Sequence, residues 1–139
     1  MGVGAWLFAG GVLAVWLGGG YLVGKRNYRR AVQTLRARRA DPSREAFTAS
    51  LSPEVRAATA EWFWQQLQAY YQPDLSPHPD DDLIRDMPID PEEPEDWVRD
   101  YCRANGLKER NLEPWPEGMA VTPRNLLGWL ENERRRLSR

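Results

Sequence analysis

The run IDPEEPEDWVRDYC, residues 89–102, contains the clearest helix start in the chain. Asp90 is a favoured N-cap residue, Pro91 suits the first helical position, and Glu93 stands where a capping box requires it. The acids that follow lie in the first turns, where negative charge complements the helix dipole. We therefore predict a helix from Asp90 to the stop signal at residues 105–106. Its predicted buried face consists of Trp97, Val98, Tyr101 and Cys102.

Two further helices are predicted on either side of this one. Upstream, Ser52-Pro53 marks a helix start, and apolar residues recur at spacings of three and four from Val55 to Tyr70. Downstream of a Pro-Trp-Pro loop at 114–116, Thr122-Pro123 marks another start, and a leucine stripe follows at positions 126, 127, 130 and 137. No segment alternates with a sustained period of two, so we predict an all-α fold.

The N-terminal segment is apolar. No charged residue occurs from Val3 to Gly24, a run of 22 residues. As a helix this run would be about 33 Å long, enough for the roughly 30 Å hydrocarbon core of a bilayer. A cleaved signal peptide needs bases before its apolar run, whereas here they follow it. We therefore predict a single transmembrane helix over residues 1–24. A stripe of small residues on it would let a second helix pack closely, although glycine is common in membrane helices in any case; the stripe comprises Gly10, Ala14, Gly18, Gly20 and Gly24.

The bases of the chain are concentrated just after this segment. Residues 1–40 hold seven of the 19 bases and none of the 20 acids, which leaves 12 bases against 20 acids in the remainder. The positive flank predicts that the N-terminus faces outward and that the C-terminal domain is cytoplasmic, at the cell inner membrane. Anionic lipid headgroups are the predicted contact of Lys25, Arg26, Arg29 and Arg30. The acidic remainder argues against nucleic acid as a partner.

The chain is thus divided into three predicted parts: a transmembrane helix at 1–24, a basic neck and linker at 25–51, and a helical domain at 52–139. The neck is predicted to extend the membrane helix outward, because its apolar stripe is thin. The linker, residues 40–51, is predicted to contain at most one helical turn, around Phe47.

The residue types form no catalytic or metal-binding set. One cysteine, Cys102, and one histidine, His78, exclude the common zinc clusters. Cys102 falls within a predicted helix and is interpreted as a small buried residue rather than a nucleophile. The aspartates at 80–82, in a proline-rich loop, lack the glycine and glutamate of an EF-hand calcium loop. We predict a non-catalytic protein without metal, cofactor or small-molecule substrate, in which these aspartates are solvated or cap helices.

Three segments resemble the acyl carrier protein fold in their order and spacing: residues 82–90 (DLIRDMPID), 97–101 (WVRDY) and 122–127 (TPRNLL). The resemblance covers roughly residues 52–137 and is greatest to an uncharacterised bacterial family of acyl-carrier-like domains. It implies a small bundle of three to four helices. It also implies a phosphopantetheine-bearing serine directly after the aspartate that opens the second helix. Here that position is Pro91, which has no hydroxyl, so the usual carrier chemistry is excluded.

The acidic second helix is the predicted partner-binding surface. In carriers, this helix meets basic patches on partner enzymes by charge complementarity. We predict a non-catalytic, membrane-anchored adaptor that binds a protein partner at the cytoplasmic face through Asp90, Glu92, Glu93, Glu95, Asp96 and Asp100. Three alternatives stay open: a merely solvated helix face, a structural subunit of a larger membrane complex recognised through its transmembrane helix, and a basic neck that senses anionic lipid.

Overall fold

The computed structural model describes residues 24–139. Within this range the chain forms helices joined by loops and no strand, which confirms the prediction of an all-helical class. The first helix, residues 24–38, is called the basic helix below. It is followed by α2 (Arg44–Leu51), α3 (Ala57–Tyr71), α4 (Glu93–Ala104), the short 3-10 helix η1 (Glu109–Asn111) and α5 (Pro123–Leu137).

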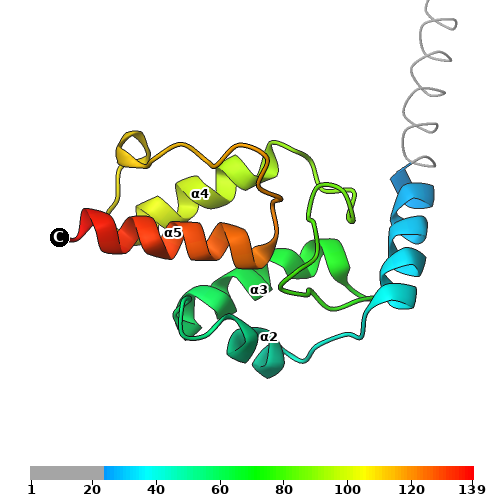
Figure 1. Ribbon diagram of the computed structural model, residues 1–139. Coiled ribbons are helices and arrows are strands. Elements are labelled where there is room, and N and C mark those ends of the chain that lie inside the picture. The colour runs from blue at the N-terminus through cyan, green and yellow to red at the C-terminus, as the bar shows by residue number, and fades with distance from the viewer. Residues whose placement is uncertain (1–23) are drawn as a thin grey trace, which may run out of the picture.

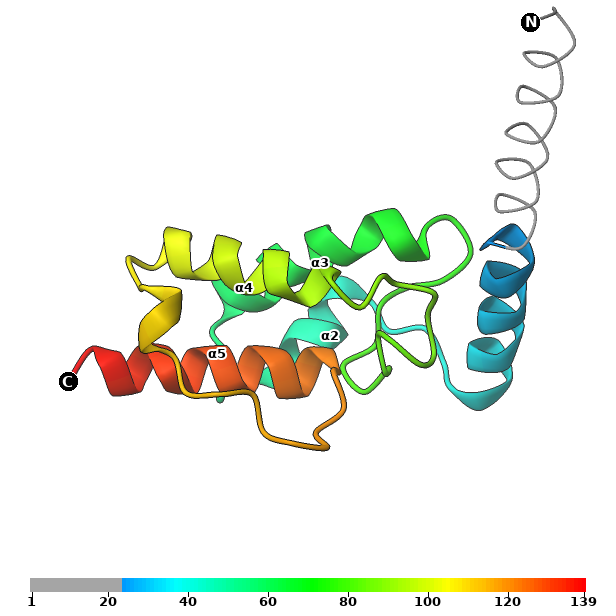
Figure 2. The ribbon, with the colours of Figure 1, turned by 90° about the horizontal axis from the view of Figure 1, so that it is seen from above.

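Helices α3, α4 and α5 form the body of the domain, and α2 packs against α3 (Figure 1). Helices α4 and α5 run in the same direction, and the view from above shows them as separate rods (Figure 2). The basic helix stands at the opposite end of the body from the C-terminus, beside the long loop between α3 and α4 (Figure 2).

The prediction of a transmembrane helix is not supported. None of the helices within residues 24–139 is long and apolar enough to cross a membrane. The predicted span lies outside the described residues except for Gly24, as do Gly10, Ala14, Gly18 and Gly20. The described helix closest to that span is the basic helix, whose charged residues exclude it from a hydrocarbon core. The all-helical class thus stands without the transmembrane helix, and the single-pass inner-membrane location with an outward N-terminus is withdrawn.

Helix α5 begins where the sequence predicts, and α4 does not. The Thr122 hydroxyl accepts a hydrogen bond from the Asn125 amide at 3.0 Å, with Pro123 in the first turn. Helix α4 begins at Glu93 rather than at Asp90, and the predicted capping box does not form. Instead, the Asp90 carboxylate accepts the Glu92 amide at 2.9 Å in a turn before the helix. Pro94 explains the later start, because a proline is favoured in the first helical turn and lacks an amide hydrogen.

The predicted linker contains a full helix. The Ser43 hydroxyl caps α2 by accepting the Ala46 amide at 3.1 Å. Phe47 and Leu51, one turn apart, are both buried. Helix α2 ends before Ser52-Pro53, so these residues lie in the turn between α2 and α3 instead of opening a helix. The predicted start at Ser52 was therefore wrong by about one turn, since α3 begins at Ala57.

The basic helix packs on the body instead of extending away from it. Val32 and Leu35 are buried in the common core, and the Tyr28 hydroxyl donates to the Tyr71 carbonyl at 3.1 Å. Lys25, Arg26, Arg29 and Arg30, in the first two turns of this helix, are all exposed. Aromatic contacts join the other layers, with ring centroids of Phe63 and Trp97 5.0 Å apart across α3 and α4. The buried core is continuous from the basic helix to α5.

Candidate functional site

The turn before α4 and its first residues form an exposed acidic surface. Asp90, Glu92 and Glu95, called the acidic edge below, are exposed and form no ion pair with any residue of the range 24–139. Their charges therefore lie open to solvent near the positive end of the helix dipole. Among the six acids predicted to bind a partner, these three have the geometry that a charged docking surface requires.

The other three predicted acids are engaged within the domain. Asp96 accepts a hydrogen bond from Arg99 at 2.7 Å, and Asp100 lies 3.7 Å from the Arg103 guanidinium. Arg99 also lies 3.6 Å from the Glu109 carboxylate on η1. The C-terminal half of α4 therefore carries nearly balanced charge, and the acidic surface is confined to its N-terminal end.

Glu93 is half-buried. Burial, followed by the effect of the Glu93 carboxylate, raises the pKa of Tyr70 to about 12. The Tyr70 side chain at the end of α3 therefore lies near Glu93 at the start of α4. Because it is only partly exposed, Glu93 does not belong to the acidic edge.

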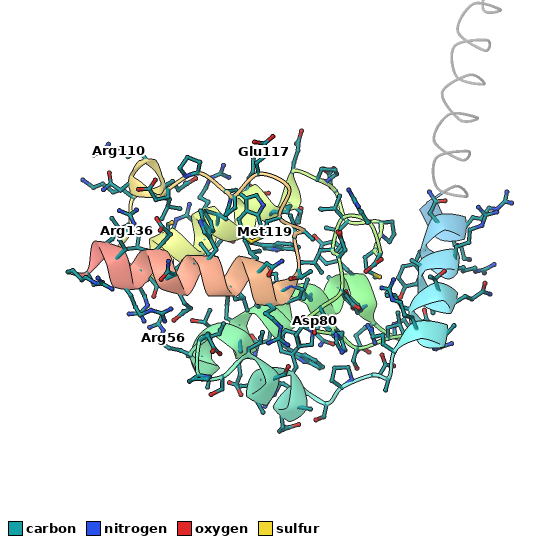
Figure 3. All side chains as sticks on the ribbon, viewed as in Figure 1. Arg56, Asp80, Arg110, Glu117, Met119 and Arg136 are labelled. Carbon is teal, nitrogen blue, oxygen red and sulfur yellow. The ribbon has the colours of Figure 1, made fainter. Side chains whose placement is uncertain are left out.

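An open apolar pocket adjoins the acidic edge. It has a volume of about 320 Å³ and is lined by residues of α4, η1 and α5, of the loop at 112–122 and of the long loop before α4. We call it the tryptophan pocket. Figure 3 shows the exposed Glu117 pointing away from the body on the loop that covers this region. The lining residues are Ile84, Pro91, Pro94, Glu95, Val98, Arg99, Glu109, Trp115, Val121, Leu126 and Trp129.

Two tryptophans, Trp115 and Trp129, contribute large apolar rings to the lining of the pocket. The Trp115 and Trp129 rings meet edge to face, with centroids 5.3 Å apart and planes at 80°. Such a pair is a favoured aromatic geometry. The Trp115 indole nitrogen donates to the Met119 carbonyl at 3.1 Å, so its polar atom is satisfied inside its own loop. Both tryptophans are half-buried, which leaves apolar ring surface facing the open pocket.

Three carboxylates of the described residues are buried, all outside the pocket, and each accepts several hydrogen bonds; Glu133 accepts from Arg136 and from the Glu113 amide. Glu131 accepts hydrogen bonds from Arg56 at 2.9 and 3.1 Å, from Thr59 at 2.6 Å and from Tyr101 at 3.0 Å (Figure 3 labels Arg56). Burial, followed by the Glu131 carboxylate, raises the pKa of Tyr101 to about 12. Both Glu131 oxygens already accept hydrogen bonds, so neither is free for acid–base chemistry. The cluster of Glu131, Arg56, Thr59 and Tyr101 joins α3, α4 and α5.

Asp81 is the second buried carboxylate. Arg39 donates to its two oxygens at 2.9 and 2.7 Å, and the Tyr71 hydroxyl donates to it at 2.8 Å. The expectation that the aspartates at 80–82 are solvated therefore fails for Asp81. Asp80 pairs with Arg124 at 2.8 Å at the start of α5, and Asp82 accepts the Ile84 and Arg85 amides in a loop turn. This loop is thus a structural clamp.

The single cysteine and the single histidine of the chain are buried or hydrogen-bonded within the domain. Cys102 is buried, and burial, with the Glu109 carboxylate, raises the pKa of its thiol. His78 accepts the Asp80 amide at its Nδ1 atom. Within the part of the chain that the structure describes, no group of His, Cys, Asp and Glu is arranged to hold a metal ion. Pro91, which the sequence resemblance would place at the carrier serine, is exposed and lines the tryptophan pocket.

Comparison of the chain with protein-family models, with curated proteins and with solved structures found no match. The resemblance to acyl carrier proteins therefore stays a prediction from sequence, and the functional argument rests on the geometry of the site.

Sequence reasoning did not find the tryptophan pocket. Its walls come from five separate segments, and no local pattern brings them together. One signal was present: Trp115 lies between two prolines in a loop, where a large apolar residue has no helix face to join. Trp129 likewise lies beside the leucine stripe of α5 instead of within it.

Proposed function

We propose that this chain is a non-catalytic adaptor that binds a basic protein partner through the acidic edge of α4. The observation that carries the proposal is the placement of Asp90, Glu92 and Glu95. They are exposed, they have no ion-pair partner among residues 24–139, and they adjoin an open apolar pocket. The sequence resemblance to acyl carrier proteins supports the same surface, because carriers use their acidic second helix to meet basic partners.

Charge complementarity of this kind acts mainly on the association rate and on partner choice. Exposed charges are screened over about 10 Å at 0.1 M salt, so binding through the acidic edge weakens as salt rises. A basic surface on the partner, rich in Lys or Arg, is the chemistry that this edge selects. Acidic or nucleic-acid partners would be repelled.

The test is a pull-down from a lysate of the source cells with three forms of the full-length chain as bait. One is the wild type, one is Glu92→Lys with Glu95→Lys, and the control is Glu45→Lys with Glu54→Lys. The control changes the net charge by the same amount and also reverses a first-turn helix acid, since Glu45 lies in the first turn of α2. Glu45 and Glu54 are exposed and make no ion pair within the described range.

The expected result is a partner that the wild type and the control retain, that raised salt elutes, and that the Glu92/Glu95 reversal does not capture. Circular dichroism of all three forms checks that each remains helical. A partner that the reversed form captures as well as the wild type does would refute the proposal, and α4 would then be only a solvated, capped helix face.

A further inference from the structure

The lining of the tryptophan pocket is mainly apolar and includes three charged side chains, Glu95, Arg99 and Glu109. Val98, Val121 and Leu126 line it together with the two indole rings, and Glu95 and Glu109 bring carboxylates to it. A volume of about 320 Å³ is at the low end of the range for ligand sites, which is roughly 300–1,000 Å³. The space therefore suits one or two large side chains.

The polar groups at the pocket are largely satisfied already. Arg99 is held by Asp96 at 2.7 Å and lies 3.6 Å from Glu109, and the Trp115 indole donates within its own loop. A polar small molecule would have to displace these contacts. An apolar group would instead gain by leaving water, because burial of apolar surface is favourable without directional partners.

The charges beside the pocket indicate what accompanies that apolar group. Glu95 belongs both to the pocket lining and to the acidic edge, and Glu92 is the N-cap residue of the same helix. Basic residues next to the apolar group would face these carboxylates, whereas acidic residues would be repelled. Protein interfaces commonly combine large buried side chains at their centre with a polar, solvent-accessible rim.

We propose that the tryptophan pocket receives one large apolar side chain, aromatic or leucine, from a segment of the partner in which Lys or Arg flanks that side chain. The proposal rests on the proposed function, because the basic flank is the feature that the acidic edge recognises. It adds that the partner is anchored at one point by apolar insertion and oriented by charge.

Short synthetic peptides, acetylated and amidated, test this directly by NMR titration of the isotope-labelled full-length chain. The probes are Lys-Lys-Trp-Lys-Lys and Lys-Lys-Leu-Lys-Lys, with Lys-Lys-Ala-Lys-Lys and Glu-Glu-Trp-Glu-Glu as matched controls. Signals of the Trp115 and Trp129 indoles report on the pocket. We expect at least one of the two anchor peptides to bind there roughly tenfold or more tightly than the alanine peptide.

Two variants separate this inference from the proposed function. Val98→Trp fills the pocket from α4 and should remove the preference for the anchor side chain while the preference for lysine over glutamate stays. The double variant Glu92→Lys, Glu95→Lys should lose the preference for lysine over glutamate and keep the preference for the anchor side chain. Trp129→Ala provides a second pocket variant should Val98→Trp perturb the fold.

Equal binding of anchor and alanine peptides, or no indole shifts with either anchor peptide, would overturn the pocket inference while a lysine preference would still support the adaptor. Indole shifts that depend on protein concentration alone would assign the pocket to a second copy of the chain and also overturn it. Anchor binding without a lysine preference would overturn the basic flank, and with it the proposed function.

Discussion

The contact between Arg39 and Asp81 fixes the end of the basic helix to the loop before α4, and Asp81→Asn should break it. The side chains are 9% and 2% exposed, and two hydrogen bonds join them at 2.9 and 2.7 Å. The Tyr71 hydroxyl adds a third bond at 2.8 Å. The amide of asparagine is neutral and presents hydrogens where the carboxylate accepts them, so it cannot satisfy all three donors.

The size of the effect follows from burial. Removing one partner of a buried ion pair costs about 3–5 kcal/mol, because the remaining charge is left uncompensated. Arg39 keeps a second carboxylate, that of Asp41, at 2.7 Å, but Asp41 is 42% exposed and compensates only in part. We therefore expect a loss at the low end, about 3 kcal/mol. For a domain of this size, such a loss lowers Tm by about 10 °C.

Urea unfolding followed by circular dichroism measures this loss, and Asp80→Asn is the matched control. Asp80 belongs to the same loop, but its pair with Arg124 has side chains 58% and 43% exposed. An exposed pair contributes about 0–1 kcal/mol. The double variant Arg39→Met with Asp81→Leu should be less destabilised than Asp81→Asn, since it leaves no buried charge. If Asp81→Asn costs no more than Asp80→Asn, the buried clamp is not a determinant of stability.

Two further predictions concern α5. Burial alone would raise the pKa of Glu131, but hydrogen bonds from Arg56, Thr59 and Tyr101 outweigh burial and the pKa lies below its usual range. The resulting stability is present above the unfolded pKa of about 4.3 and is lost as pH falls through the folded value. The loss in free energy of unfolding that Glu131→Gln causes, measured by urea unfolding, should therefore shrink from pH 7 to pH 3. A loss that is the same at both pH values would contradict this. Thr122→Ala should lower the free energy of unfolding by about 1 kcal/mol because the cap of α5 is lost, whereas Thr122→Ser should keep most of that stability. Equal stability of the two variants would show that the Thr122 cap does not stabilise α5.

The sequence was informative where the determinants of structure are local. The start of α5 follows from the Thr122-Pro123 cap, and the buried face of α4 follows from the spacing of Trp97 and Tyr101, both 2% exposed. Helix α2 was not predicted, because Phe47 and Leu51 alone form too short an apolar stripe and the start of the helix depends on the Ser43 cap. Exposure of the acidic edge was also predictable, since acids on the polar face of a helix rarely become buried.

Features that depend on distant parts of the chain could not be predicted in the same way. Arg39 and Asp81 are 42 residues apart, and Arg56 and Glu131 are 75 apart, so no local pattern indicates either pair. The thin stripe of Val32 and Leu35 suggested a helix extending away from the domain, whereas both residues are buried against it. Equally, the tryptophan pocket exists only once α4 and α5 have come together with two loops.

The central claim is that the acidic edge recognises a basic partner, and the most direct measurement is the affinity of the captured partner at two salt concentrations. The full-length wild type and the Glu92→Lys, Glu95→Lys variant would be titrated with it at 50 and 300 mM NaCl. The account predicts that wild-type binding weakens as salt rises, and that the variant binds at least tenfold more weakly at 50 mM with less dependence on salt. Equal affinity of the two forms, unchanged by salt, would contradict it.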